Sequence, residues 1–153
     1  MKRVYFPIFV DMKNKTALVI GGGQVAERRV KILAAFAAKV TVISPQASDY
    51  IKAAALQGEI RLLGRKYQDG DIADIKPFLL IAASDDRQTN RQAMLEAAQL
   101  DILASVADSR EECTFYFPAI AESEDYIAGI VSKNGNHAGV RRMAEKTREL
   151  LAT

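Results

Sequence analysis

Short apolar segments recur along the first 107 residues and alternate with segments of helical character. The continuous apolar run of residues 16–20 predicts a strand buried on both faces, and the other segments also predict strands. These strands comprise residues 16–20, 39–43, 59–63, 78–83 and 102–107. The predicted helices comprise residues 24–36, 49–56 and 90–100, with at most a brief helix within residues 67–78. Strands that alternate with helices form a parallel sheet, so we expect an α/β fold, a Rossmann-type parallel sheet with helices on both faces.

The alternation of predicted strands and helices ends after Asp108. The remaining segments are a compact aromatic stretch, a strand, a polar turn and an amphipathic helix, in residues 115–120, 126–131, 132–136 and 138–151. A strand and one helix cannot bury an apolar face by themselves. We therefore expect this part to pack on the sheet domain or on a second copy of itself, and we divide the chain into residues 1–112 and 113–153.

The composition is that of a globular domain with one core. Of 153 residues, 49% are hydrophobic and 26% are charged, which argues against disorder, collagen-like repeats and a disulfide-rich scaffold. The net charge of +2 creates no field that would demand nucleic acid. Cys113 and His137 are the single cysteine and the single histidine, so a disulfide within the chain, a cysteine-based zinc or iron–sulfur site and a two-histidine metal site are excluded. No metal site is expected.

The N-terminal sequence is unlike a secretory signal. Its apolar stretch is interrupted by Pro7 and then by Asp11. No uncharged run in the chain approaches the roughly 20 residues needed to cross a bilayer. We therefore expect a cytoplasmic protein that has neither a membrane nor nucleic acid among its partners.

A glycine-rich motif joins the first predicted strand to the first predicted helix. It fits the pattern G-x-G-x-x-A and consists of Gly21, Gly22, Gly23, Gln24, Val25 and Ala26. A strand before the motif and a helix after it, within one βαβ unit, are the context in which this pattern binds a dinucleotide. The glycines allow a sharp turn, and the backbone amides at the helix N-terminus attract a diphosphate. The alternative is a glycine turn that binds nothing.

Polar residues follow other strands of the predicted sheet at the same edge. Ser44 ends the second strand, where many dinucleotide sites carry an acidic residue that binds the ribose hydroxyls. A serine neither clamps a diol nor repels a 2′-phosphate, so the residues alone leave NAD and NADP open. Ser84, Asp85 and Asp86 follow the fourth strand and are expected to bound the cofactor crevice. For these residues and for Asn90, capping of the next helix is the alternative.

The order of these motifs resembles precorrin-2 dehydrogenase, the NAD-dependent module of siroheme synthases, over nearly the whole chain. The matching segments are residues 5–10 (YFPIFV), residues 21–29 (GGGxVAxRR), Ser44-Pro45, residues 82–86 with Asn90, Asp108, and residues 117–120 (FPAI). The resemblance implies oxidation of precorrin-2 to sirohydrochlorin with NAD⁺ as hydride acceptor. In some members it also implies insertion of ferrous iron. Members are homodimers joined by the segment after the nucleotide domain, so residues 113–153 are expected to form a short strand-helix dimerisation segment.

The resemblance also assigns roles to residues. The functional aspartate of the family falls on Asp108, the expected catalytic residue, with a loop or helix-cap aspartate as the alternative. The cofactor, implied to be NAD, is expected to contact the glycine motif, Ser44 and residues 84–86. Polar and basic residues of the last segment are candidates for binding substrate carboxylates across a dimer, with an exposed basic helix face as the alternative. These candidates are Ser132, Lys133, Arg141 and Arg142.

The chain departs from the family at a few positions. Ser105 stands where members commonly have asparagine, and residues 132–138 lack one glycine and the proline of the usual turn. Longer members continue into a further helical region that helps to enclose the tetrapyrrole. These departures keep two other functions in view: an NAD-binding sensor, and a non-catalytic partner subunit in tetrapyrrole synthesis.

Overall fold

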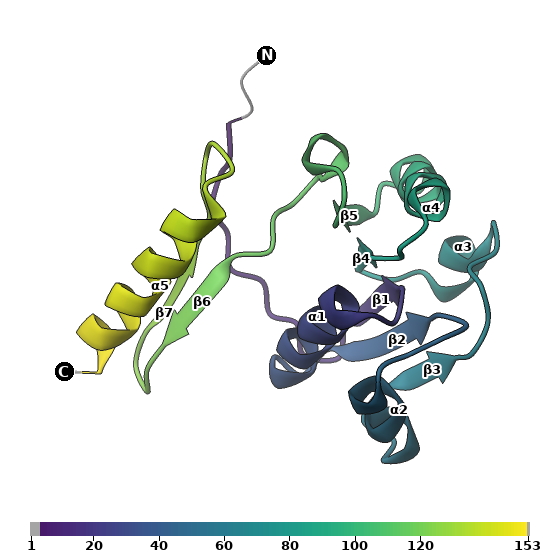
Figure 1. The fold of residues 1–153 in the computed structure, drawn as a ribbon, viewed down its shortest axis with the longest axis horizontal. Helices are drawn as coiled ribbons and strands as arrows, with labels where there is room; N and C mark the ends of the chain where they lie inside the picture. Colours follow the sequence, from purple (N-terminus) through teal and green to yellow (C-terminus); the bar gives the residue numbers. More distant parts are fainter. Residues whose placement is uncertain (1–3, 153) are drawn as a thin grey trace. The chain divides into compact units, whose positions relative to one another are not determined.

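The computed structural model describes residues 4–152, which form two compact units divided between Thr114 and Phe115. The larger unit holds a five-stranded sheet with its helices, and the smaller holds a two-stranded sheet with one helix (Figure 1). No helix within residues 4–152 is long and apolar enough to span a bilayer.

The sheet of the larger unit is entirely parallel and has the strand order β3-β2-β1-β4-β5. Its strands are β1 (Thr16–Ile20), β2 (Lys39–Ile43), β3 (Arg61–Leu63), β4 (Leu79–Ala82) and β5 (Leu103–Val106). The chain builds outward from β1 to β3, then returns to the other side of β1 for β4. The carboxyl ends of β1 and β4 therefore form a topological switch point, the place where open parallel sheets bind ligands.

Helices pack on both faces of this sheet. They are α1 (Gln24–Ala35), α2 (Asp49–Leu56), α3 (Asp71–Ile75) and α4 (Arg87–Gln99), followed by the 3-10 turn η1 (Arg110–Glu112). Helix α1 contacts α2, and α3 contacts α4 (Figure 1). The two pairs lie on opposite faces because the crossovers run in opposite directions on either side of β1. The α/β fold expected from the sequence is confirmed.

The core of the larger unit consists of the central strands. Leu18, Val19 and Leu80 are fully buried, as their continuous apolar runs predicted. Two boundaries of this unit differ from the predictions by more than one residue. Strand β3 begins at Arg61 rather than residue 59, after a turn in which Gly58 has φ +75°. Helix α4 begins at Arg87 rather than Asn90, because Asp86 accepts a hydrogen bond from the amide of Gln88 and caps the helix earlier.

The chain after η1 covers the free edge of β5. The amide of Ala104 donates to Thr114 Oγ1 at 2.8 Å, and the amide of Thr114 donates to the carbonyl of Ala104 at 2.8 Å. The amide of Val106 donates to Cys113 Sγ at 3.2 Å. Cys113 is thus a buried small side chain at the sheet edge.

The smaller unit is an antiparallel hairpin with one helix. Strands β6 (Ala119–Glu122) and β7 (Ile127–Ile130) pair, and α5 (His137–Leu151) contacts both of them. Ala121 and Ala144 are buried. Strand β6 was not predicted, since alanines have little strand preference and this strand depends on its pairing with β7.

Candidate nucleotide site

The glycine turn after β1 holds the loops of two neighbouring strands close to itself. Gly21 has φ +114°, and a Cβ added there would lie 2.2 Å from the carbonyl oxygen of Ala83, at the end of β4. A Cβ at Gly22 would lie 2.1 Å from the carbonyl oxygen of Gln46, after β2. Both glycines are therefore required for packing of the carboxyl edge, independently of any ligand.

Gly23 differs from the two glycines before it. A Cβ built at Gly23 meets no atom within 4 Å, and the residue is exposed. Gly23 is the N-cap of α1, whose first amides receive no side-chain cap. An open glycine before an uncapped helix N-terminus leaves backbone donors available to a diphosphate, so this turn fits a dinucleotide.

The next residues of the motif divide between surface and core. Gln24 and Val25 are exposed in the first turn of α1. Ala26 is fully buried, so its contribution is the close approach of α1 to the sheet, which is the usual role of the third small residue.

Ser44 lies beside the glycine turn at the end of β2. Its hydroxyl donates a hydrogen bond of 2.5 Å to the carbonyl of Gln46. The amide of Ser48 donates to the carbonyl of Gly22 at 2.8 Å and ties the same loop to the glycine turn. Because its proton is already donated, the Ser44 hydroxyl offers a ligand lone pairs only.

The loop after β4 is organised mainly by its own polar groups. Asp86 accepts hydrogen bonds from the Gln88 amide at 3.1 Å and from Thr89 Oγ1 at 2.6 Å. The hydrogen bond from Thr89, followed by that from Gln88, lowers the pKa of Asp86. Ser84 Oγ accepts from the Asp86 amide at 3.1 Å, while Asp85 is exposed. Asp86 thus has the helix-capping role, and contact of these residues with a cofactor remains a prediction.

Asp108 lies directly after β5 at the same edge of the sheet. Its Oδ1 accepts from Arg87 Nη1 at 3.0 Å, and its Oδ2 accepts from Asn90 Nδ2 at 3.0 Å. The side chain of Asp108 is 37% exposed, so the carboxylate is both held and accessible. Arg87 also donates to Glu112 Oε1 at 2.5 Å, and the bonds to these two carboxylates, led by that to Glu112, raise the pKa of Arg87. Sequence reasoning missed Arg87, whose only signal was a cation directly after Asp85 and Asp86.

The candidate substrate residues belong to the smaller unit. Ser132 Oγ accepts hydrogen bonds from the amides of Asn134 and Asn136 and donates to Asn134 Oδ1, so it organises the turn before α5. Lys133, Arg141 and Arg142 are exposed. Their contact with a substrate remains a prediction.

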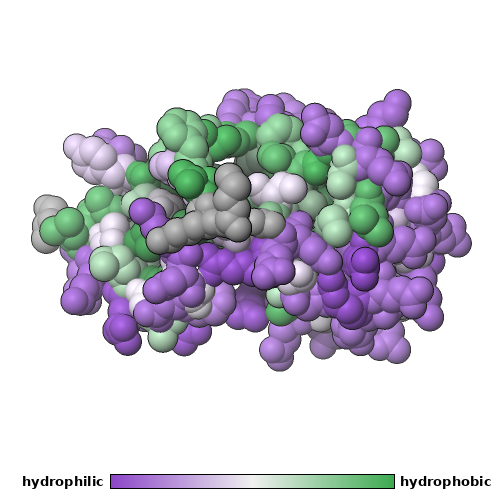
Figure 2. All heavy atoms as spheres, turned by 90° about the horizontal axis from the view of Figure 1, so that it is seen from above, coloured by the Kyte–Doolittle hydropathy of each residue, from purple (hydrophilic) through white to green (hydrophobic). Residues whose placement is uncertain are grey.

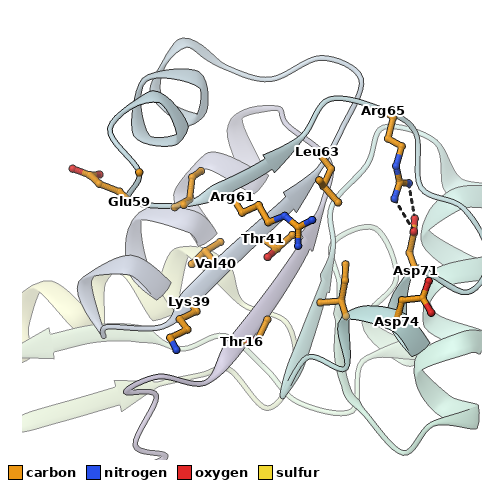
Figure 3. Close-up of a pocket in the computed structure, with 13 residues that line it drawn as sticks. Thr16, Lys39, Val40, Thr41, Glu59, Arg61, Leu63, Arg65, Asp71 and Asp74 are labelled. Carbon is orange, nitrogen blue, oxygen red and sulfur yellow. Dashed lines mark hydrogen bonds and ion pairs between the residues drawn. The ribbon is translucent and has the colours of Figure 1, made fainter.

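A groove of about 700 Å³ lies elsewhere on the larger unit (Figure 3). It includes Thr16 and Lys39, the first residues of β1 and β2, and so lies toward the amino ends of the strands. Arg65 and Asp71 form a bidentate ion pair beside it, with both distances 2.8 Å, and this pair lowers the pKa of Asp71. None of the sequence-predicted site residues lines this groove. Within residues 4–152, no three His, Cys, Asp or Glu side chains are grouped so that they could hold a metal ion.

Comparison with known proteins defines the class of the chain. Residues 8–119 match the family model described as "Putative NAD(P)-binding". This match spans β1 to β5 and therefore contains the glycine turn and Asp108.

The chain is also similar to proteins of siroheme synthesis. The chain is 41% identical over 146 residues to "Probable multifunctional siroheme biosynthesis protein HemA" of Ruminiclostridium josui, covering 95% of this chain and 28% of that protein. It is 33% identical over 147 residues to "Siroheme synthase 1" of Serratia proteamaculans (strain 568), covering 96% of this chain and 30% of that protein. The chain therefore belongs to the NAD(P)-binding family. It is similar to part of these siroheme-related proteins and spans less than a third of their length.

A solved structure has the same fold. The chain superimposes on "SirC, precorrin-2 dehydrogenase" with a TM-score of 0.81 and 23% sequence identity, covering 95% of this chain and 71% of that one. The family resemblance and the fold expected from the sequence are both confirmed.

Proposed function

We propose that this protein oxidises precorrin-2 to sirohydrochlorin with NAD⁺ as the hydride acceptor. The observation that carries the proposal is the position of Asp108, an accessible carboxylate at the same sheet edge as the open glycine turn. The siroheme-related names of its relatives support the same substrate.

The backbone would hold the nucleotide and the side chains would orient it. The amides from Gly23 onward at the N-terminus of α1 suit a diphosphate, because they are exposed and uncapped. Ser44 would accept a hydrogen bond from a ribose hydroxyl, and the loop at Ser84 would bound the crevice beyond β4. When bound, NAD⁺ supplies the nicotinamide ring that takes up a hydride.

Asp108 would take up the proton released in the reaction. Oxidation removes two hydrogens from precorrin-2, one as a hydride and one as a proton. NAD⁺ accepts the hydride, so NADH and H⁺ are formed together with sirohydrochlorin. Each Asp108 oxygen accepts one hydrogen bond from a donor, which leaves a lone pair on each for the proton. The proton then passes to water, because the carboxylate is partly exposed.

The chemistry of Ser44 favours NAD over NADP. Its proton is donated to Gln46, so it can accept a hydrogen bond but has no second proton to donate. A ribose hydroxyl can donate to it, whereas an ionised 2′-phosphate offers acceptors alone. The two acceptors would repel each other at this position.

The smaller unit supports a homodimer as the working form. Large side chains with apolar surface are exposed on it, namely Tyr126, Ile127, Val131, Met143 and Leu150. Figure 2 shows hydrophobic residues (green) at the surface of the protein among hydrophilic ones (purple). A two-stranded hairpin with one helix buries too little surface to be stable alone, and exposed apolar side chains mark an interaction surface. In such a dimer Ser132, Lys133, Arg141 and Arg142 are our candidates for binding the carboxylates of the tetrapyrrole.

The direct test is formation of NADH, followed at the nicotinamide absorbance, when the purified chain is mixed with precorrin-2 and NAD⁺. The expected result is stoichiometric NADH and sirohydrochlorin. NAD⁺ binding without turnover would instead indicate the sensor. Tetrapyrrole binding without NAD⁺ binding would indicate the partner subunit. Insertion of ferrous iron, which is a substrate in that step, is tested separately by the absorbance of siroheme after iron is added.

A further inference from the structure

One buried amide joins the ends of two strands at the nucleotide edge. Asn90 on α4 is fully buried. Its Oδ1 accepts from the amide of Ser84 at 2.9 Å, and its Nδ2 donates to the carbonyl of Ser84 at 2.9 Å and to Asp108 Oδ2 at 3.0 Å. Both amide protons are therefore used, one for the loop after β4 and one for the carboxylate after β5.

The three partners fix the orientation of the amide group. The oxygen faces an N–H donor, and the nitrogen faces a carbonyl and a carboxylate. A flipped amide would therefore place its NH₂ group against the N–H donor and its oxygen against the two acceptors. An aspartate has the same shape but would place a second carboxylate against Asp108. A leucine would leave the peptide of Ser84 without either of these hydrogen bonds in a buried setting.

Of the two groups that donate hydrogen bonds to Asp108, the buried amide of Asn90 is held more rigidly than the guanidinium of Arg87. The Arg87 side chain is 46% exposed and is shared with Glu112, so its ion pair is screened by solvent. The side-chain amide of Asn90 is shielded from water and is also held by two hydrogen bonds to the backbone of Ser84. The position of the Asp108 carboxylate therefore follows the position of Asn90.

We propose that Asn90 is a positioning residue that sets the Asp108 carboxylate relative to the Ser84 loop. The inference rests on the proposed function, in which that loop bounds the cofactor crevice beyond β4 and Asp108 accepts the proton. A single buried side chain then fixes the position of the base relative to the wall of the crevice. Turnover is sensitive to such misplacement even where binding is not.

The decisive variant is Asn90→Asp, which keeps the shape and the acceptor for the Ser84 amide but removes both Nδ2 donors. We expect kcat to fall at least about tenfold, while the dissociation constant for NAD⁺ changes less than about threefold. Two carboxylates that share a site bind a proton more tightly, so the acid limb of the kcat profile should move to higher pH by about one unit. The charged groups that face Asp108 are Arg87 from α4 and, through that guanidinium, Glu112 from η1.

Ala97→Gly is the matched control for destabilisation. Ala97 is also fully buried on α4, its methyl group cannot hydrogen-bond to Ser84 or Asp108, and glycine in its place weakens the helix. Below its midpoint of thermal unfolding, this variant should keep the wild-type kcat and pH profile. A kcat of Asn90→Asp within twofold of wild type would overturn the inference and leave the proposed function intact.

A second measurement needs no substrate. The carboxyl carbon of Asp108 can be titrated by NMR in the wild type and in Asn90→Asp, and we expect a higher midpoint in the variant. If the wild type forms no NADH from precorrin-2, the proposed function is wrong, and this titration alone decides whether Asn90 positions Asp108. Equal midpoints would then rule the positioning role out.

Discussion

A Cβ on Gly21 would lie 2.2 Å from the carbonyl oxygen of Ala83, so the glycine turn after β1 and the end of β4 are packed against each other without room for a side chain. A Cβ on Gly23, two residues further along the chain, would meet no atom within 4 Å. The two glycines therefore serve different purposes, one in packing and one in access.

Substitution of each glycine by alanine should separate these purposes. Gly21→Ala forces a methyl into backbone at φ +114° and should reduce the free energy of unfolding by about 2 to 3 kcal/mol. Gly23→Ala should cost at most about 1 kcal/mol, because its extended backbone accepts alanine. The added methyl should nonetheless weaken NAD⁺ binding at least about tenfold, equivalent to about 1.4 kcal/mol. Thermal unfolding and calorimetric titration measure the two effects. An unchanged affinity of Gly23→Ala would argue against a diphosphate at this turn.

Removal of the Asp108 carboxylate should separate chemistry from binding. We expect Asp108→Ala to lower kcat by about a hundredfold or more, because general-base catalysis contributes at that level, while NAD⁺ affinity stays within about threefold. Stopped-flow absorbance and titration of NAD⁺ measure the two quantities. Asp74→Ala, at an exposed position on α3, is the control and should behave as wild type. Undiminished turnover in Asp108→Ala would show that the base lies elsewhere.

Acid should weaken the larger unit through the Arg65–Asp71 pair. The hydrogen bond from Arg65 lowers the pKa of Asp71 below its ordinary value of 3.8, so the folded state binds this proton less readily than the unfolded chain. The resulting stability is fully present above the unfolded-state pKa and is lost as the pH falls through the lower folded-state pKa. Asp71→Asn should therefore be less stable than wild type at pH 6, and the difference should shrink by pH 2.5. Urea denaturation at both pH values checks this. A difference that is independent of pH would contradict it.

The proposed homodimer can be tested on one face of α5. Met143 is 55% exposed, and Met143→Glu places a charge where we expect an apolar contact between copies. The variant should elute as a monomer in size-exclusion chromatography with light scattering, while wild type elutes as a dimer. Glu145→Lys, at an exposed position on the opposite side of the same helix, should leave the dimer unchanged. A wild-type chain that is monomeric at micromolar concentration would refute the dimer.

The larger unit was predictable because its central strands are buried. Residues 16–20 are a continuous apolar run, residues 39–43 are rich in β-branched side chains, and the glycine motif lies between the first strand and helix, so local pattern and topology agree. Strand β6 was not predictable in this way. Its residues Ala119 to Glu122 carry no strong strand preference, and only the pairing with β7 defines it.

The candidate site was predictable as a set of loops but not as a network of contacts. The motifs placed Ser84 and Asp108 at one edge, because parallel strands end there together. That Asn90 binds both of them, and that Arg87 links Asp108 to Glu112, depends on side-chain positions that no spacing encodes. Asn90 and Asp108 are far apart in sequence, and their contact exists only after β5 is docked beside β4.

The hydrogen bonds of Cys113 and Thr114 along β5 have a consequence for association. A bare strand edge can pair with a strand of another chain. Ala104 and Val106 are already hydrogen-bonded to the thiol, hydroxyl and peptide groups of Cys113 and Thr114. Association of copies by sheet extension along this edge is therefore disfavoured.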